Sequence, residues 1–187
     1  MAQIGMVYPV FAPISSISGS TITYGTGVVI GRAVAGSLQW TRDDAVLYGD
    51  DAVAESDNTA TGYTLDITTT ELPEDVETVI LGTVKSGGEY SEYNDPGPDG
   101  GMGYVQVLKR NGTLLYRGVW YPKISFARTS EESNTKGQSI SWGTPQIHGT
   151  GMGVFDSTSG KTLLRKKQVF SSAASAIAWL KTLANIT

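Results

Sequence analysis

The chain has 187 residues, a length that suits one domain or two small ones, and 40% of them are aliphatic or aromatic, enough for a hydrophobic core. It contains no cysteine, which excludes a disulfide framework, thiolate chemistry and cysteine-based metal sites. The net charge is only −4, but residues 42–99 hold fifteen acids and two bases, whereas residues 100–187 hold three acids and eleven bases. If the fold keeps these segments apart, the molecule has an acidic and a basic surface; if it interleaves them, the charges cancel internally.

The N-terminal stretch MAQIGMVYPVFAPISS contains neither a basic n-region nor the long apolar core of a signal peptide. No window of the chain approaches the roughly 18 apolar residues that a membrane-spanning helix needs. We therefore expect an intracellularly made, soluble protein without a membrane span.

Two segments of the first half read as β-strands. Glycine is abundant, with 23 residues, and Thr, Ser, Val and Tyr are frequent, a mixture typical of strands and tight turns. Residues 21–40 alternate well enough for one bent strand or two short ones, with glycines at the bends. Residues 61–70 alternate strictly, because Tyr63, Leu65 and Ile67 fall on one side and polar residues on the other. This second segment is predicted to be a half-buried strand.

A long acidic segment, residues 40–60, separates these strands and begins with WTRDDAVLYGDDAVAESDN. Six acids and a single arginine surround the apolar trio Val46, Leu47 and Tyr48. Connections longer than about 12–15 residues without structure of their own are usually functional or disordered. The trio is therefore expected either to fold back onto its own subunit or to be buried against another molecule.

Residues 71–82 change to a helical period. Pro73 suits a first helical turn, and three acids favour its positive N-terminal end. Val76, Val79 and Ile80 form a one-sided apolar stripe. A short amphipathic helix lying on a sheet is therefore predicted.

The Gly/Pro-rich stretch 85–103 has turn residues and no periodicity, so a loop is expected. Asn111-Gly112 then lies between two β-like runs, the strongest short-range signal for a hairpin, because both residues tolerate positive φ. Residues 123–127 continue the meander, residues 128–137 read as a polar loop, and two more short strands surround Thr144-Pro145.

The C-terminal segment, residues 171–185, is predicted to be a helix with a serine near its N-cap. Its apolar residues gather on one side: Ala173, Ile177, Trp179, Leu180, Leu183 and Ala184. The whole chain, residues 1–187, is expected to form one mainly β domain. Its architecture should be an antiparallel sandwich or barrel-like sheet with one short amphipathic helix and this C-terminal helix.

The sequence offers no catalytic constellation. The single histidine, His148, lies on a predicted strand without a G-x-S-x-G nucleophile motif, which favours a structural or surface role. The run GTGVVIG lacks the spacing of a phosphate-binding loop, and the pairs Asp43-Asp44 and Asp50-Asp51 lack the spacing of a calcium loop. The basic run LLRKK, residues 163–167, is too small for a DNA-binding face. We therefore expect no enzyme, no cofactor and no metal site.

Four stretches follow one another in a recognisable order: VLYGDD at 46–51, YTLDITTTELPEDVETVILG at 63–82, YRGVWYPKISFA at 116–127 and TKGQSISWGTPQIHGT at 135–150. Together they resemble the major tail protein of long-tailed, non-contractile phages of Gram-positive bacteria. In that family a Leu-Tyr-small-Asp-Asp motif precedes a strand and a short helix, and a Thr-Lys-Gly turn leads into a paired strand. The resemblance spans roughly residues 20–150 and is compatible with the C-terminal helix. The loop 85–103 and residues 1–20 match none of its motifs.

The resemblance implies a structural virion protein of the tail-tube fold, made in the host cytoplasm, that assembles with itself into rings, usually of six subunits. Stacked rings form the tail tube, through which double-stranded DNA passes, and the tape measure, tail terminator and distal tail proteins are further partners. Basic linings bind DNA non-specifically and would retard its passage, so a net acidic lumen is expected.

In this interpretation the segment 40–60 is an arm that leaves its own subunit to contact the next ring, with Leu47 and Tyr48 as buried apolar anchors. Its acids meet a basic surface from residues 100–187 or line the channel. The arm residues concerned are Trp40, Asp43, Asp44, Leu47, Tyr48, Asp50 and Asp51. The complementary basic surface consists of Lys161, Arg165, Lys166 and Lys167.

Two other functions stay open from the residues alone. A receptor-binding or virion decoration domain would form discrete particles and never filaments. A carbohydrate-active enzyme would lose turnover when one carboxylate is replaced. The lone histidine, the absence of cysteine and the split charge favour self-assembly over both.

Overall fold

The computed structural model describes residues 2–19, 21–49, 52–94, 96–130 and 143–187, with the backbone alone for 44–49, 52–57 and 130. In this part of the chain the strands are β1 (Ala2–Ser18), β2 (Thr21–Tyr24), β3 (Val28–Val29), β4 (Ala33–Gly49), β5 (Ala52–Thr69), β6 (Val84–Ser86), β7 (Glu89–Ser91), β8 (Gly100–Arg110), β9 (Thr113–Ser130), β10 (Gln146–Met152), β11 (Val154–Asp156), β12 (Lys161–Leu163) and β13 (Lys166–Phe170). The helices are α1 (Glu74–Ile80) and α2 (Ala173–Leu183). The expected fold class, mainly β and antiparallel with a short helix and a C-terminal helix, is confirmed.

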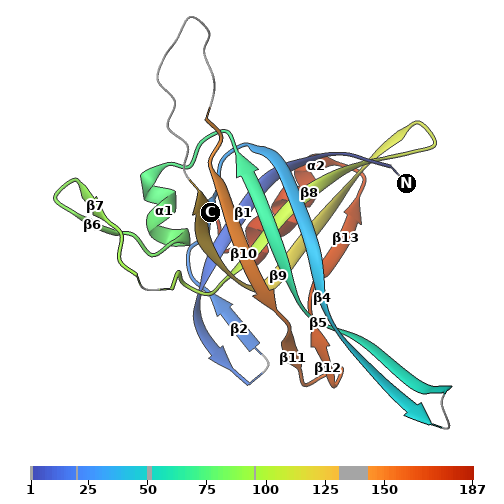
Figure 1. The fold of residues 1–187 in the computed structure, drawn as a ribbon. Helices are drawn as coiled ribbons and strands as arrows, with labels where there is room; N and C mark the ends of the chain where they lie inside the picture. Colours follow the sequence, from blue (N-terminus) through green and yellow to red (C-terminus); the bar gives the residue numbers. More distant parts are fainter. Residues whose placement is uncertain (1, 20, 50–51, 95, 131–142) are drawn as a thin grey trace, which may run out of the picture.

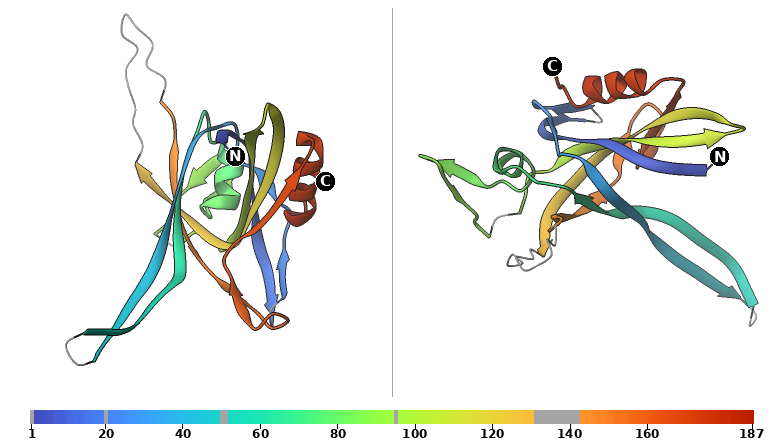
Figure 2. Two further views of the ribbon diagram at one scale, coloured as in Figure 1. Left: turned by 90° about the vertical axis from the view of Figure 1, so that its right-hand side faces the viewer. Right: turned by 90° about the horizontal axis from the view of Figure 1, so that it is seen from above.

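The main sheet has the strand order β2-β1-β8-β9-β10-β5-β4, with β3 also paired to β1 and β13 also paired to β9. Figures 1 and 2 show the sheet folding over, so that β4, β5 and β10 lie opposite β1 and β8. α1 lies at one side of the space between them, and α2 covers the outer face of β1, β8 and β9.

Two hydrophobic clusters lie on the two faces of this sheet. The inner cluster includes side chains from β1, β5, β8, β9, β10 and α1, namely Phe11, Tyr63, Leu65, Ile67, Ile80, Met102, Tyr104, Val119, Tyr121, Ile124, Phe126 and Ile147, together with Ile30. The outer cluster lies beneath α2 and consists of Val10, Ala12, Val105, Trp120, Ala176, Leu180 and Ala184. The central strands are therefore buried on both faces, where burial stabilises the fold most.

Helix α2 packs closely on the sheet because two strand residues beneath it are glycines. A Cβ at Gly118 would lie 2.5 Å from the Trp179 ring, and one at Gly103 would lie 2.6 Å from Leu180 Cδ2. The helix begins at Ser172, whose Oγ accepts a hydrogen bond from the Ser175 amide at 3.2 Å.

Several predictions from local patterns are confirmed. The predicted strand 61–70 belongs to β5 up to Thr69, with its three predicted apolar residues fully buried. Asn111 and Gly112 both have positive φ at the turn between β8 and β9. The short helix extends over Glu74–Ile80 within the predicted 71–82, and the C-terminal helix lies within 171–185.

Other predictions were wrong or incomplete. Residues 1–20, for which no element was predicted, contain the 17-residue strand β1. The expected loop 85–103 contains the β6–β7 hairpin and the first residues of β8, because Gly87 and Gly88 adopt positive φ at a tight turn. Residues 123–127 are not a separate strand but part of β9. The loop predicted for 128–137 falls largely outside the described residues, as does the strand expected before Thr144-Pro145.

Strands β10 and β13 share one edge of β9, although a separate hairpin lies between them in sequence. β10 pairs with the C-terminal part of β9, ending at Gly151 opposite Ile124, and β13 begins at Lys166 opposite Trp120. Both are antiparallel to β9 and lie on the side away from β8. The intervening residues form the β11–β12 hairpin, a two-stranded sheet of its own.

Candidate assembly surfaces

The arm, residues 40–60, is the outer part of the long hairpin formed by β4 and β5. β10 pairs with β5 only as far as Gly62 opposite Met152, so within the described chain β4 and β5 beyond this point pair with each other alone. Their pairing continues outward to Gly49 opposite Ala52. Figures 1 and 2 show this two-stranded ribbon projecting away from the folded sheet. Residues 40–49 and 52–60 are thus strand, not the unstructured connection that the length of the segment suggested.

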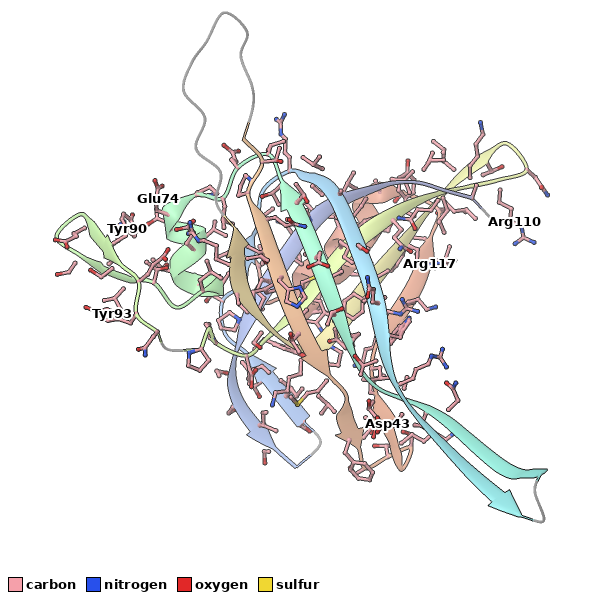
Figure 3. The ribbon with its side chains drawn as sticks, viewed as in Figure 1. Asp43, Glu74, Tyr90, Tyr93, Arg110 and Arg117 are labelled. Carbon is pink, nitrogen blue, oxygen red and sulfur yellow. The ribbon has the colours of Figure 1, made fainter. Side chains whose placement is uncertain are left out.

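The structure places the predicted arm residues unequally. Trp40 is partly buried at the base of the ribbon, and Asp43 is exposed just beyond it (Figure 3). Asp44, Leu47 and Tyr48 lie on β4, where their backbone alone is described. The remaining two, Asp50 and Asp51, lie outside the described residues. That this ribbon contacts another subunit stays a prediction.

The base of the arm is fixed by an aromatic stack that includes one predicted basic residue. The Trp40 ring packs edge-on against Tyr63, with ring centroids 5.8 Å apart, and the Arg165 guanidinium lies 4.9 Å from the Trp40 centroid. The same guanidinium lies 6.0 Å from the ring of Tyr121. Tyr63 is held in turn by its hydroxyl, which donates to the Lys123 carbonyl at 2.8 Å, and burial raises its pKa above the ordinary value. Trp40 and Arg165, predicted for opposite sides of an intersubunit contact, therefore meet within one subunit.

The other predicted basic residues are exposed on two strands. Lys161 lies on β12, whereas Lys166 and Lys167 lie on β13. Two further exposed cations lie at the tip of the β8–β9 hairpin, and a partly buried one lies on β9 beside β13. Figure 3 shows Arg110 and Arg117 on this same side of the molecule. We refer to these residues as the basic end: Lys109, Arg110, Arg117, Lys166 and Lys167.

Like charges crowd one part of the basic end. The pKa of Lys167 is held below its ordinary value, first by the charge of Arg165, then by partial burial and by the charge of Arg117. Residues 100–127 and 160–187 together contain nine bases and no acid, so these segments cannot supply a neutralising carboxylate.

The opposite side of the molecule carries α1 and the β6–β7 hairpin (Figure 3). Its carboxylates, together with the exposed tyrosine that follows β7, form what we call the acidic end: Glu71, Glu74, Asp75, Glu77, Glu89, Glu92 and Tyr93. Twelve of the fifteen acids in residues 42–99 therefore belong either to this end or to the arm.

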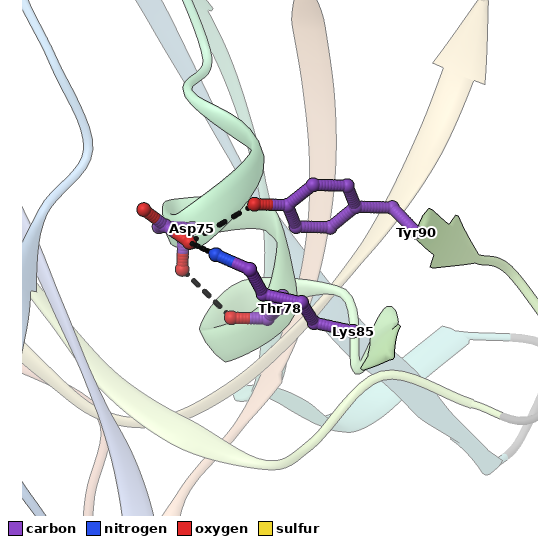
Figure 4. A network of polar contacts seen from close by, with 4 residues as sticks. All are labelled: Asp75, Thr78, Lys85 and Tyr90. Carbon is purple, nitrogen blue, oxygen red and sulfur yellow. Dashed lines mark hydrogen bonds and ion pairs between the residues drawn. The ribbon is translucent and has the colours of Figure 1, made fainter. Parts of the chain in front are cut away.

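A polar network fastens the β6–β7 hairpin to α1 (Figure 4). Asp75 Oδ1 accepts from Lys85 Nζ at 2.7 Å and from the Tyr90 hydroxyl at 3.1 Å, and Lys85 Nζ lies 5.1 Å from the Tyr90 ring centroid. Thr78 Oγ1 donates to the Asp75 carbonyl at 2.7 Å. The hydrogen bonds with Lys85 and Tyr90 lower the pKa of Asp75, and those with Asp75 and Tyr90 raise the pKa of Lys85, although both side chains are exposed.

A second connection comes from the sheet. Arg128 on β9 donates to Glu77 Oε1 at 2.7 Å, and its guanidinium lies 3.0 Å from Glu92 Oε1. The Glu77 side chain is only 14% exposed, and burial raises its pKa more than the charge of Arg128 lowers it. One arginine thus joins the helix, the segment after β7 and the main sheet.

Sequence reasoning missed both the acidic end and the tip of the basic end. The basic tip could have been found, since Lys109 and Arg110 directly precede the Asn111-Gly112 turn and a hairpin turn exposes its flanking residues. No local pattern in the sequence indicated the acidic end, because its ion pair between Arg128 and Glu77 joins residues 51 positions apart.

The lone histidine lies on β10 opposite Asp66 of β5, with His148 Nδ1 2.5 Å from Asp66 Oδ1 and both side chains partly exposed. Within the described residues, no group of three or more His, Asp or Glu side chains is arranged to hold a metal ion.

None of the helices that the structure describes is long and apolar enough to cross a membrane. In comparisons with known proteins, no protein-family model matches the chain, and no curated protein matches its sequence.

Proposed function

We propose that this protein is a structural subunit that assembles with copies of itself into rings, and that the rings stack into a hollow tube. In this proposal the tube is a phage tail tube that conducts double-stranded DNA in the virion, and the chain has no catalytic role. Its other partners would be the proteins that set the length and close the ends of such a tube. A decoration or receptor-binding domain is the alternative.

The observation that carries the proposal is the arm. A two-stranded ribbon on its own is marginally stable in water, because it leaves both edges unpaired and buries little apolar area. This one extends well past the point where β10 stops pairing with β5, and it carries Leu47 and Tyr48 toward its far end. A partner that covers the ribbon would stabilise it, and in a homopolymer that partner is another copy of the chain.

The placement of the ribbon also supports open-ended assembly. A contact between a projecting ribbon and a different surface of the next copy is heterologous, and repeated heterologous contacts generate rings or filaments. The exposed Asp43 at the root and the further acids along the sequence of the arm fit a conduit that repels DNA.

The test is negative-stain electron microscopy of the purified protein at rising concentration, beside a Leu47→Asp, Tyr48→Asp double variant. We expect hollow tubes from the wild type and, from the double variant, folded particles that do not stack into tubes. Ile17→Asp, which places the same charge on an exposed apolar residue of β1, is the control and should still assemble.

Tubes from both the wild type and the double variant would keep the function and remove the role of the arm. Discrete particles under every condition, including addition of a preformed tail tip as initiator, would contradict the proposal and favour the decoration or receptor-binding alternative.

A further inference from the structure

We propose that the acidic end of one copy docks on the basic end of the next, and that this contact closes the ring. The inference rests on the proposed function and deepens it by naming a second copy of this chain as the partner of both ends. The sequence predicted no role for the acidic end and predicted that Lys166 and Lys167 contact the arm.

Among the described residues, each end gathers side chains whose charge is mainly of one sign. At the acidic end six carboxylates outnumber the two cations that pair with them, Lys85 and Arg128. Glu71, Glu74 and Glu89 are all exposed there. At the basic end the cations lie on sequence segments without any acid, and the pKa of Lys167 is lowered by the nearby charge of Arg165, by partial burial and by the charge of Arg117. Carboxylates from a second molecule would relieve the repulsion between these positive charges.

The two ends cannot meet within one molecule. Figure 3 shows Glu74, Tyr90 and Tyr93 on one side of the folded sheet and Arg110 and Arg117 on the other. Complementary surfaces that point in opposite directions pair head to tail between copies, and such pairing closes a ring when the rotation between neighbours allows it. The arm supplies a separate contact, so one set of surfaces closes rings and another stacks them.

Both ends also offer apolar area at their surface. Tyr93 and Val84 at the acidic end are 66% and 49% exposed, and Leu114 and Val169 beside the basic cations are 45% and 47% exposed. Interfaces typically combine such an apolar centre, often with an aromatic anchor, with a charged rim that fixes register and speeds encounter. The four residues fit the centre, and the charged side chains fit the rim.

The acidic end is prepared for docking by its own contacts. The Asp75–Lys85–Tyr90 network and the Arg128 bridge hold the β6–β7 hairpin in one position against α1 (Figure 4). A surface that is ordered before binding loses less conformational entropy on association. Only the rim side chains remain to be ordered.

A charge-swap cycle tests the contact. One variant carries Glu74→Lys and Glu89→Lys, another carries Lys109→Glu and Arg110→Glu, and a third combines all four changes. All four residues are exposed, so the fold should persist, as circular dichroism and thermal unfolding would verify. Sedimentation velocity and electron microscopy then measure the concentration at which rings form.

Each two-residue variant should raise that concentration by about tenfold or more, because like charges would face each other across the contact. The combined variant should restore it, since its two ends are complementary again. Ring formation by the wild type should weaken as salt is added. A two-residue variant that assembles like the wild type, or a folded combined variant that stays dispersed, would overturn the inference.

A second measurement separates this inference from the proposed function. Zero-length carbodiimide cross-linking of mixed isotope-labelled and unlabelled chains should join Lys109 or Lys167 to Glu74 or Glu89 of a different copy. Tubes whose cross-links join other surfaces would overturn the ring contact and leave the tube function standing. A wild type that forms only a closed dimer, or no assembly and no such cross-links, would overturn both.

Discussion

The arm and the acidic end both come from the acid-rich part of the chain, yet they are held in different ways. The β6–β7 hairpin rests on a helix and is tied to it and to the sheet by Asp75 and Arg128. The outer arm has strand pairing between β4 and β5, reinforced at its root by Arg42 Nη1, which donates to Asn58 Oδ1 at 2.7 Å. A projection supported by its own subunit keeps its shape alone, whereas a ribbon gains most of its order from a partner.

Deleting the arm should have the largest effect on assembly and little effect on the fold. Replacing residues 43–59 by Asn-Gly joins Arg42 to Ala60, which already face each other, through a favourable hairpin turn. We expect loss of tube formation with little change in the thermal unfolding midpoint, because the inner and outer clusters lie elsewhere. Electron microscopy and circular dichroism measure the two effects. Tubes formed by the shortened chain would show that stacking does not need the arm.

Removing the Arg128 ion pairs at the acidic end should lower the free energy of unfolding, in contrast to removing the arm. Arg128→Ala leaves the largely buried Glu77 without its cation, and we expect a loss of roughly 1–3 kcal/mol in the free energy of unfolding. Urea denaturation measures it. Lys123→Ala, which removes a cation 3.1 Å from the more exposed Asp99, is the control and should cost less. An equal loss from both variants would contradict a special role for Arg128.

The root of the arm offers a smaller test. Arg165→Ala should destabilise the protein by about 1 kcal/mol, and Trp40→Ala by more, because it also removes the contact with Tyr63. The loss in the double variant should be smaller than the sum of the two, because both changes remove the Trp40–Arg165 contact. Arg165→Lys keeps the charge but not the planar group, so it should lose part of the effect. Strictly additive losses in urea denaturation would show that the Trp40–Arg165 contact contributes no coupling energy.

The smallest expected effects are the opposite contributions of two carboxylates of α1 to the pH dependence of stability. Burial raises the folded-state pKa of Glu77 above 4.5, so stability falls as pH rises from that value through the folded pKa, and Glu77→Gln should remove the fall. Hydrogen bonds lower the pKa of Asp75 below 3.8, so its contribution is present above that value and lost as pH falls through the folded pKa. Asp75→Asn should remove this acid-side loss. The free energy of unfolding of each protein is measured from pH 2 to 7. A variant whose pH dependence matches that of the wild type would show that its carboxylate was wrongly assigned.

Sequence patterns over a few residues correctly predicted a strand, a turn and a helix, whose formation depends on neighbouring residues. The alternation around Leu65, the Asn111-Gly112 turn and the stripe ending at Ile80 each depend on residues a few positions apart, and each element was found where expected. Strand β1 gave no such signal. Val10, Phe11 and Ala12 are buried on both faces of the sheet, and Tyr8 has a positive φ within the register shift between Val7 and Val10, so no alternation remains in the sequence of β1.

The candidate surfaces were less predictable because distant residues create them. The segment 40–60 was singled out correctly as unusual, but its strand pairing depends on cross-strand neighbours. Arg165 appeared to be a surface cation, yet the fold places it on Trp40, which lies 125 positions earlier. The acidic end exists only because Arg128 and Lys85 bring a helix and a hairpin together.

The interrupted strand formed by β10 and β13 has a consequence for engineering. Because both pair with the same edge of β9, the β11–β12 hairpin between them can change in length without shifting either register. Its turn is exposed and closed by Asp156, whose carboxylate accepts from the Thr158 amide and the Ser159 hydroxyl. In the proposed tube, a foreign peptide or a small folded domain inserted at this turn would be carried by every subunit, so the hairpin would suit multivalent display.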